Sequence, residues 1–174
     1  MVGILGSSKI ASVISPHRLR GGERCESLSS TERCNWGSSC AIWRRRYVDV
    51  YGIGPWEFAR IDLGDANNYR EYGRPVERST RIAVATVGQV MWELIEPLDE
   101  EGIYARFLAE KGEGIHHVAV ATPNFDETVA RAERKDGVML SCKHSGIDIA
   151  YLDSLRDLGV VLEVFSGFQD KEAL

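Results

Sequence analysis

Two stretches of this sequence present the same order of elements, and this internal repeat limits the folds that the chain can adopt. The later stretch reads as one strand, one helix and three more strands, at 115–122, 124–135, 138–142, 147–152 and 160–165. The earlier stretch reads as the end of a helix followed by three strands, at 43–51, 56–61, 80–86 and 90–95. The second half is therefore β-α-β-β-β. The first half matches the same unit with its beginning missing, which gives a repeat of about 60–70 residues.

Each half ends in an apolar strand that carries a single carboxylate, Glu93 in the first half and Glu163 in the second. The strand that opens the second half carries His117, which shares its face with the small residues Ala119 and Ala121. An ionised carboxylate inside an apolar strand is costly unless a partner compensates it. If the two halves pack as one curved sheet, a divalent cation on its concave face would compensate all three groups at once.

Carboxylate and imidazole ligands suit Zn, Mn, Co, Ni or Fe(II) and leave positions open for substrate oxygens. Each residue also has a plainer interpretation when it is taken alone. A single histidine at a strand start is more often a hydrogen-bonded structural residue, and a single glutamate often lies on a solvent face. His116 is expected to point to the face opposite His117 and to be structural.

The composition fits a globular chain of one domain or of two small modules that share a core, with 174 residues, 44% of them hydrophobic. No apolar run approaches the roughly 20 residues that span a bilayer, and the start lacks a signal-peptide layout, so we expect a cytoplasmic protein without a membrane partner. The four cysteines form no CxxC pair, and disulfides are not implied. The net charge of −5 disfavours nucleic acid as a partner.

The first 46 residues differ from the rest. They hold eight Lys/Arg against three Asp/Glu and nine of the fourteen serines, and their hydrophobic pattern is poor. From Tyr47 onward the sequence is patterned as a globular domain should be.

The motifs at 51–56, 93–97, 112–117, 151–153 and 158–163 resemble those of the vicinal oxygen chelate superfamily. Its members include glyoxalase I, methylmalonyl-CoA epimerase, extradiol dioxygenases and bleomycin-resistance proteins, and the likeness is greatest to the epimerase-like branch. The resemblance implies an α+β fold in which paired βαβββ modules form a cupped eight-stranded sheet around one metal, here with the first module incomplete at its N-terminus.

The resemblance also implies roles for particular residues. Glu93, His117 and Glu163 match metal-ligand positions for one divalent ion, and Glu163 is also placed near the proton-transfer chemistry. The implied activity is that of a metal-dependent lyase or isomerase that acts through an enolate. Its substrate would be a small molecule, an acyl-CoA thioester or a hemithioacetal, and its assembly a homodimer. Alternatives are a non-catalytic module that binds a small ligand and, less favoured, an Fe(II) extradiol dioxygenase, which usually needs two histidines and one carboxylate.

The N-terminal region departs from the family pattern, which opens with an apolar strand carrying a histidine or glutamine ligand. Residues 34–43 do not alternate and show no ligand, but plausible codons read two bases further along give such a strand with a glutamine. We therefore divide the chain into an atypical segment 1–44, out of frame or disordered, a domain at 45–167, and a tail at 168–174. Within the domain we expect module one at 45–100, a linking helix at 101–113 and module two at 114–167. A divergent N-terminal extension is the alternative, and the coding DNA distinguishes the two.

Overall fold

One ten-stranded sheet organises the computed structural model, which describes residues 9–14, 44–135 and 137–166. The strands are β1 (Lys9–Ile14), β2 (Glu57–Leu63), β3 (Arg70–Glu71), β4 (Arg74–Pro75), β5 (Arg78–Val87), β6 (Val90–Pro97), β7 (Gly114–Ala121), β8 (Val138–His144), β9 (Ile147–Leu152) and β10 (Val161–Phe165). The helical elements are the π-helical η1 (Arg44–Val50), the 3₁₀ turn η2 (Asp65–Asn67), α2 (Ile103–Lys111), α3 (Phe125–Lys135) and α4 (Leu155–Leu158).

The sheet consists of two matching halves. The strand order is β2-β5-β6-β1-β7-β10-β9-β8-β3-β4, and β1 and β7 run antiparallel beside each other at the centre. In each half the first strand is followed by a helix and three strands, and the last of these returns parallel to the first: β6 beside β1, and β10 beside β7. This arrangement confirms the prediction of an α+β fold with paired βαβββ modules. The short strands β3 and β4 extend the eight long strands at one edge.

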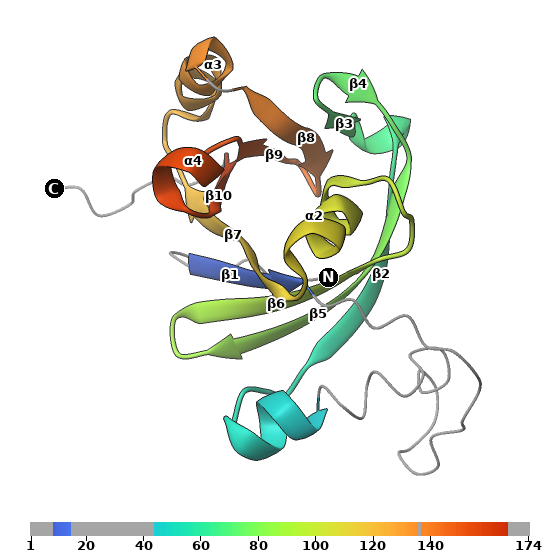
Figure 1. The fold of residues 1–174 in the computed structure, drawn as a ribbon. Helices are drawn as coiled ribbons and strands as arrows, with labels where there is room; N and C mark the ends of the chain where they lie inside the picture. Colours follow the sequence, from blue (N-terminus) through green and yellow to red (C-terminus); the bar gives the residue numbers. More distant parts are fainter. Residues whose placement is uncertain (1–8, 15–43, 136, 167–174) are drawn as a thin grey trace, which may run out of the picture.

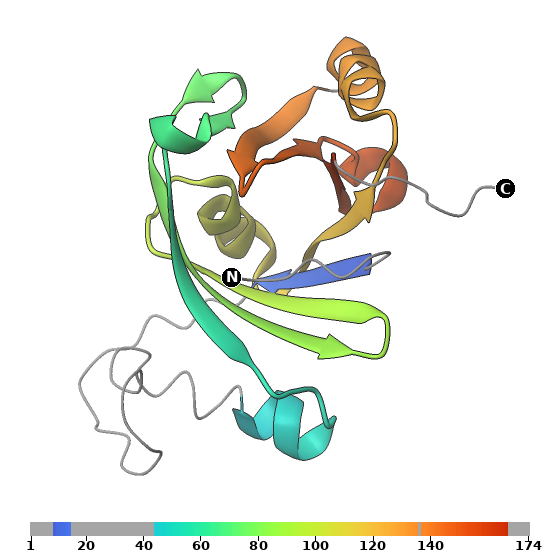
Figure 2. The same ribbon diagram turned by 180° about the vertical axis from the view of Figure 1, so that it is seen from behind.

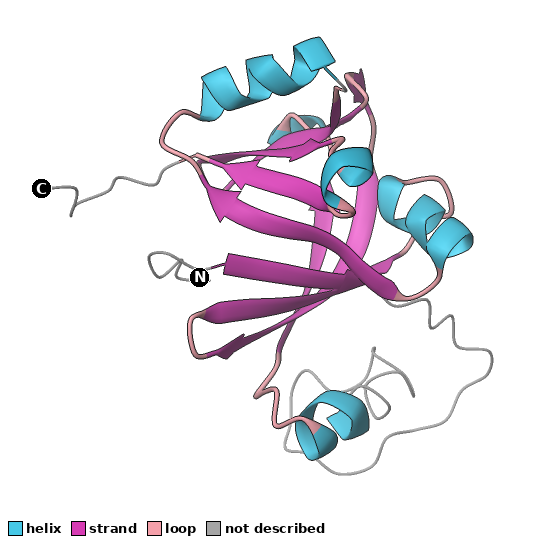
Figure 3. Cartoon of the chain, turned by 60° about the vertical axis from the view of Figure 1, so that its left-hand side comes forward, coloured by secondary structure: helices cyan, strands magenta, loops and turns pink. Residues whose placement is uncertain are grey.

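The sheet curves strongly, as Figure 1 and the view from behind in Figure 2 show. The chain passes from β2, at one edge, through η2 directly to β3, which pairs with β8 at the other side of the sheet. The helix between the two modules, α2, lies across one open end of this curved sheet (Figures 1 and 3). None of the helices in the described ranges is both long and apolar enough to cross a membrane.

Hydrophobic contacts fix α3 to the outer face of module two. Phe125, Val129 and Ala132 of α3 pack with Ala150 and Leu152 of β9. These two β9 residues point away from the concave face because side chains alternate along a strand. The concave face of this module is consequently left for the residues between them and for their neighbours on β10 and β7.

Two regions differ from the sequence-based expectation. Lys9–Ile14 forms a strand within the segment predicted to be atypical, and it occupies the place where module one was expected to lack its opening strand. Residues 64–79, between the strands expected at 56–61 and 80–86, contain η2, β3 and β4. The strands β1 and β3 are held by partners distant in the sequence, and such pairing has no local periodicity to reveal it. Residues 34–43, on which the out-of-frame hypothesis rests, and the tail 168–174 lie outside the described residues.

Candidate functional site

The structure brings together the three residues singled out in the sequence. The Nε2 atom of His117 on β7 lies 3.0 Å from Oε2 of Glu163 on β10 and 3.7 Å from Oε2 of Glu93 on β6. Glu93 and Glu163 are 70 positions apart in the sequence. One imidazole nitrogen therefore faces one carboxylate from each module.

Strand register explains this convergence. In β1, Ser12 stands opposite Glu93 on one side and opposite His117 on the other, so a single strand separates these two residues. On the far side of β7, Glu163 stands opposite Ala119, which is two positions beyond His117 on the same face. The small alanine side chain leaves room for the carboxylate to reach the imidazole.

Burial is uneven across the three residues. His117 is completely buried and Glu163 is 8% exposed, whereas the side chain of Glu93 is 20% exposed. Two carboxylates beside one imidazole in a buried place repel one another unless positive charge lies between them. The most exposed member of the group is therefore Glu93, which belongs to module one.

Two tyrosines that the sequence analysis missed complete this group. The hydroxyl of Tyr151 lies 3.2 Å from Nε2 of His117, and the hydroxyl of Tyr104 on α2 lies 2.8 Å from that of Tyr151. Burial raises the pKa of both phenols well above the ordinary tyrosine value, with nearby Glu163 adding to the effect at Tyr151, so both keep their protons at neutral pH. Tyr151 stands directly opposite Glu163 in the β9–β10 pair, and this pairing is the signal that could have identified it.

His116 does not point away from His117, contrary to the expectation from strand alternation. Ser12 of β1 pairs with His117 and Val13 pairs with Ile115, so His116 is the extra residue of a β-bulge. The bulge interrupts the alternation, and Nδ1 of His116 lies 3.1 Å from Nδ1 of His117. Burial, with a contribution from His117, lowers the pKa of His116 to about 3, so this imidazole stays neutral.

A second buried carboxylate, also missed, fixes α2 in place. Glu71 on β3 is 4% exposed, and its Oε1 atom accepts hydrogen bonds from the hydroxyl of Tyr69 at 3.1 Å, from Nε of Arg78 at 3.2 Å and from the backbone N–H of Ile103 at 3.4 Å. Because Ile103 begins α2, Glu71 attaches the first turn of that helix to the sheet. The same helix presents Tyr104 to the site.

The donor set fits a divalent metal in chemistry but not in number. Two ligand atoms that share an ion at about 2.1 Å and at right angles are about 3.0 Å apart, which matches the separation of His117 Nε2 and Glu163 Oε2. As they stand, the described residues contain no group of three or more His, Cys, Asp or Glu side chains arranged to hold an ion. Glu93 lies farther from Nε2, and Tyr151 is also bonded to that nitrogen, so both would have to shift slightly.

The position in module one that corresponds to His117 can be located from the backbone. Ser12 pairs with Glu93 in module one as Ala119 pairs with Glu163 in module two. Ile10, two positions before Ser12, is therefore the counterpart of His117 and has no ligating atom.

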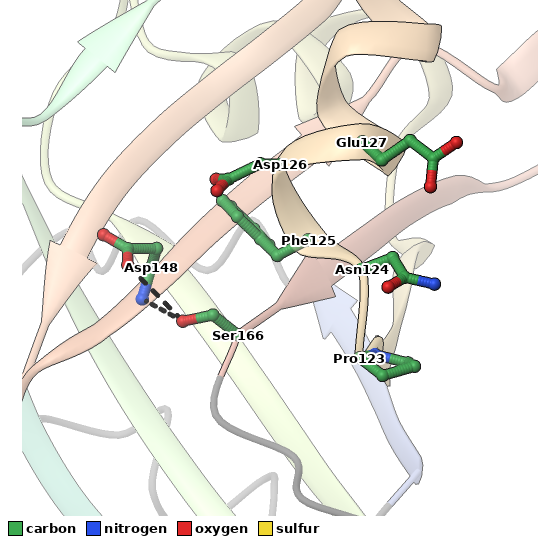
Figure 4. A pocket seen from close by; sticks show the side chains of 7 residues that line it. All are labelled: Pro123, Asn124, Phe125, Asp126, Glu127, Asp148 and Ser166. Atoms are coloured by element: carbon green, nitrogen blue, oxygen red, sulfur yellow. Dashed lines mark hydrogen bonds between the residues drawn. The ribbon is translucent and has the colours of Figure 1, made fainter.

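A surface hollow elsewhere contains none of these residues. It lies between residues 123–127 at the start of α3, Asp148 and Ser166 (Figure 4). Phe125 packs on the outer face of the sheet, and Asp148 alternates with Ile149 and therefore points to that face too. The hollow is separated from Glu163 by the sheet, and its acidic lining offers no chemistry to the candidate site.

Comparison with known proteins identifies the family of this chain. The model of the Glyoxalase/Bleomycin resistance protein/Dioxygenase superfamily matches residues 38–151. The chain belongs to this superfamily. The resemblance noted in the sequence is thus confirmed, while β1 lies before the matched range. No curated protein sequence matches this superfamily member significantly.

Solved structures of low sequence identity share the fold of this superfamily member. A hypothetical protein from Bacillus halodurans has a TM-score of 0.54 at 19% identity, covering 95% of this chain and 99% of that one. A variant of Streptomyces coelicolor methylmalonyl-CoA epimerase in complex with 2-nitronate-propionyl-CoA gives 0.55 at 18%, with 92% and 96% covered. The methylmalonyl-CoA epimerase of Mycobacterium tuberculosis gives 0.53 at 18%, with 95% and 94% covered. At these identities the likeness establishes the fold alone.

Proposed function

We propose that this chain is a metal-dependent isomerase or lyase that moves a proton next to a carbonyl group of a small substrate, an acyl-CoA thioester or a hemithioacetal, through an enolate. The observation that carries the proposal is the approach of His117 Nε2 to the carboxylates of Glu163 and Glu93 on one face of the sheet. His117, Glu93 and Glu163 would hold the ion. A bound divalent cation supplies Lewis acidity, which lowers the energy of an enolate oxygen.

The chain's own residues would handle the proton. Glu163 is almost buried and lies beside His117, so its carboxylate is placed to take a proton from the carbon next to the carbonyl and to return it. The hydroxyls of Tyr151 and Tyr104 line the same place and can donate hydrogen bonds to a substrate oxygen. The helix α2 behind them excludes water from that side, while Glu93 marks the side from which a substrate enters.

The direct test is deuterium incorporation at the carbon next to the thioester carbonyl of methylmalonyl-CoA in deuterated water, together with elemental analysis of the purified full chain. We expect a stoichiometric divalent metal and exchange that Glu163→Gln abolishes. Glu127→Gln on the exposed face of α3 is the matched control and should exchange at the wild-type rate. Full exchange in the Glu163→Gln variant would remove that residue from the proton transfer.

A non-catalytic module that binds a small ligand is the second candidate, and one contact favours it. Tyr151 is bonded to His117 Nε2, the nitrogen that an ion would need. Retained ligand binding without stoichiometric metal would support this candidate. The extradiol dioxygenase stays less favoured because His116 faces the Nδ1 side of His117 and not Nε2, and oxygen uptake with catechols tests it. A homodimer in the cytoplasm remains a prediction.

A further inference from the structure

The second histidine of the pair is buried against the first, on the side away from the carboxylates. His116 is 1% exposed, and its Nδ1 atom lies 3.1 Å from Nδ1 of His117. The ring packs edge-on against Tyr104 and Phe107 of α2, with centroid separations of 5.1 and 5.0 Å. The strand supplies this neighbour through its bulge, and α2 holds it in place.

Hydrogen-bond chemistry allows only two arrangements of this contact when both rings face each other through Nδ1. Either His117 donates its Nδ1–H to His116, or His116 donates and His117 accepts. The other ring atom of His117, Nε2, has the hydroxyl of Tyr151 at 3.2 Å and Glu163 Oε2 at 3.0 Å. These neighbours decide which arrangement suits the site.

If His117 accepted at Nδ1, Nε2 would have to keep its only proton and would be blocked as a ligand. If His117 donates at Nδ1, its ring retains one proton there whatever Nε2 holds. Nε2 is then left without a proton, and because Glu163 Oε2 at 3.0 Å can only accept, this arrangement suits the site when a cation separates the two atoms. Histidines that bind metals generally donate their other N–H to a neighbouring group, which orients the ring.

We infer that His116 is the positioning residue of His117: its Nδ1 accepts the Nδ1–H of His117 and so directs Nε2 towards Glu93 and Glu163. The direction of this hydrogen bond rests on the proposed function, because in a chain without an ion a proton on Nε2 would suit Glu163 Oε2. The neighbour is another histidine held by a bulge, in the place where a carboxylate or a backbone carbonyl is usual.

The first experiment locates the ring protons directly, in the full chain loaded with Zn²⁺. Nitrogen-15 NMR of the labelled full chain should show a proton on Nδ1 of His117, none on Nδ1 of His116, and a coupling between the two nitrogens across the hydrogen bond. A proton on Nδ1 of His116 instead would overturn the inference, as would the absence of any coupling.

The second experiment measures Co²⁺ affinity of three full-length variants by visible absorption. His116→Phe keeps an aromatic ring between Tyr104 and Phe107 but has no acceptor, and we expect its affinity to fall by about 10- to 100-fold. His116→Asn places its amide oxygen where Nδ1 stands and should retain most of the affinity. His116→Gln places its amide one bond farther and should resemble the phenylalanine variant.

The outcomes distinguish a failure of the positioning role from a failure of the proposed function. Wild-type affinity in both the Phe and Gln variants would overturn the positioning role of His116 while leaving the metal site intact. A wild-type chain that binds neither Co²⁺ nor Zn²⁺ would refute the proposed function and, with it, the direction of this hydrogen bond. Thermal unfolding of each variant identifies any loss of affinity caused by a failure to fold.

Discussion

The two modules share a topology but contribute unequally to the site. Module two supplies His117 and Glu163, whose nearest atoms are 3.0 Å apart, together with Tyr151 on the adjacent strand. Within the described residues, module one supplies Glu93, whose carboxylate is 3.7 Å from the imidazole. A repeated fold therefore does not require a repeated function, because register fixes which positions meet while the residue types at those positions remain free.

The outer layers of the two modules are also unequal, and module two again has the more extensive contacts. In module two α3 packs its apolar side on β9 and β10. In module one η1 ends at Val50, which is 68% exposed, and the neighbouring Tyr51 is equally exposed. Among the described residues no hydrophobic cluster joins η1 to β2, β5 or β6 as α3 is joined to its strands.

The largest expected effect concerns the two central strands. Ala11 in β1 pairs with Val118 in β7, so proline at either position removes a ladder N–H from the middle of the sheet. We expect Ala11→Pro and Val118→Pro each to lower the free energy of unfolding by about 3 kcal/mol or more. Denaturant unfolding followed by circular dichroism measures this, with Ala11→Ser and Val118→Thr as controls. A harmless Ala11→Pro would show that β1 is not the structural counterpart of β7.

The next effect concerns the two carboxylates. Because Glu163 is closer to His117 and more buried than Glu93, it should contribute more to metal affinity. We expect Glu163→Gln to weaken Co²⁺ binding by about 100-fold or more and Glu93→Gln by about 10-fold. Isothermal titration calorimetry gives both constants. Equal losses would mean that the modules contribute equally despite their different geometry.

A third prediction concerns a histidine introduced into module one at the position that corresponds to His117. Ile10 is the register counterpart of His117, so Ile10→His should supply a further nitrogen donor and raise Co²⁺ affinity by about tenfold. The same substitution at Lys9, one register position away in β1, is the matched control. Improved binding in the Lys9→His variant alone would contradict the proposed register.

The smallest effect concerns the helices. Val129 lies against the sheet, so Val129→Ala should lower the free energy of unfolding by about 1 kcal/mol. Val50 is largely exposed, so Val50→Ala should change it by less than about 0.5 kcal/mol. Thermal unfolding compares the two. A larger loss at Val50 would show that η1 is packed as closely as α3.

The sequence predicted those parts of the molecule that depend on local pattern. The hairpin of β5 and β6, the helix α2 and the elements of module two other than α4 follow from alternation, helical spacing and glycine positions, such as Gly88 with its φ of +62° in the hairpin turn. The convergence of Glu93, His117 and Glu163 followed from their place in apolar strands.

The sequence could not predict features that depend on contacts between distant segments. The two-residue strand β3 exists because β8 pairs with it, and the burial of Glu71 depends on an arginine and a helix start elsewhere in the chain. The face on which His116 lies was predicted wrongly because a bulge depends on the partner strand and leaves no periodic signal.

That bulge also governs how substitutions and length changes act in this strand. The extra residue within 114–117 reverses the face on which every earlier side chain of the strand lies. In a strand with the same pair of histidines but without a bulge, the first histidine would lie on the face opposite the second. Counting histidines in an alignment is therefore a poor guide to coordination in such strands. Spacing relative to Ser12 of the partner strand is the better one.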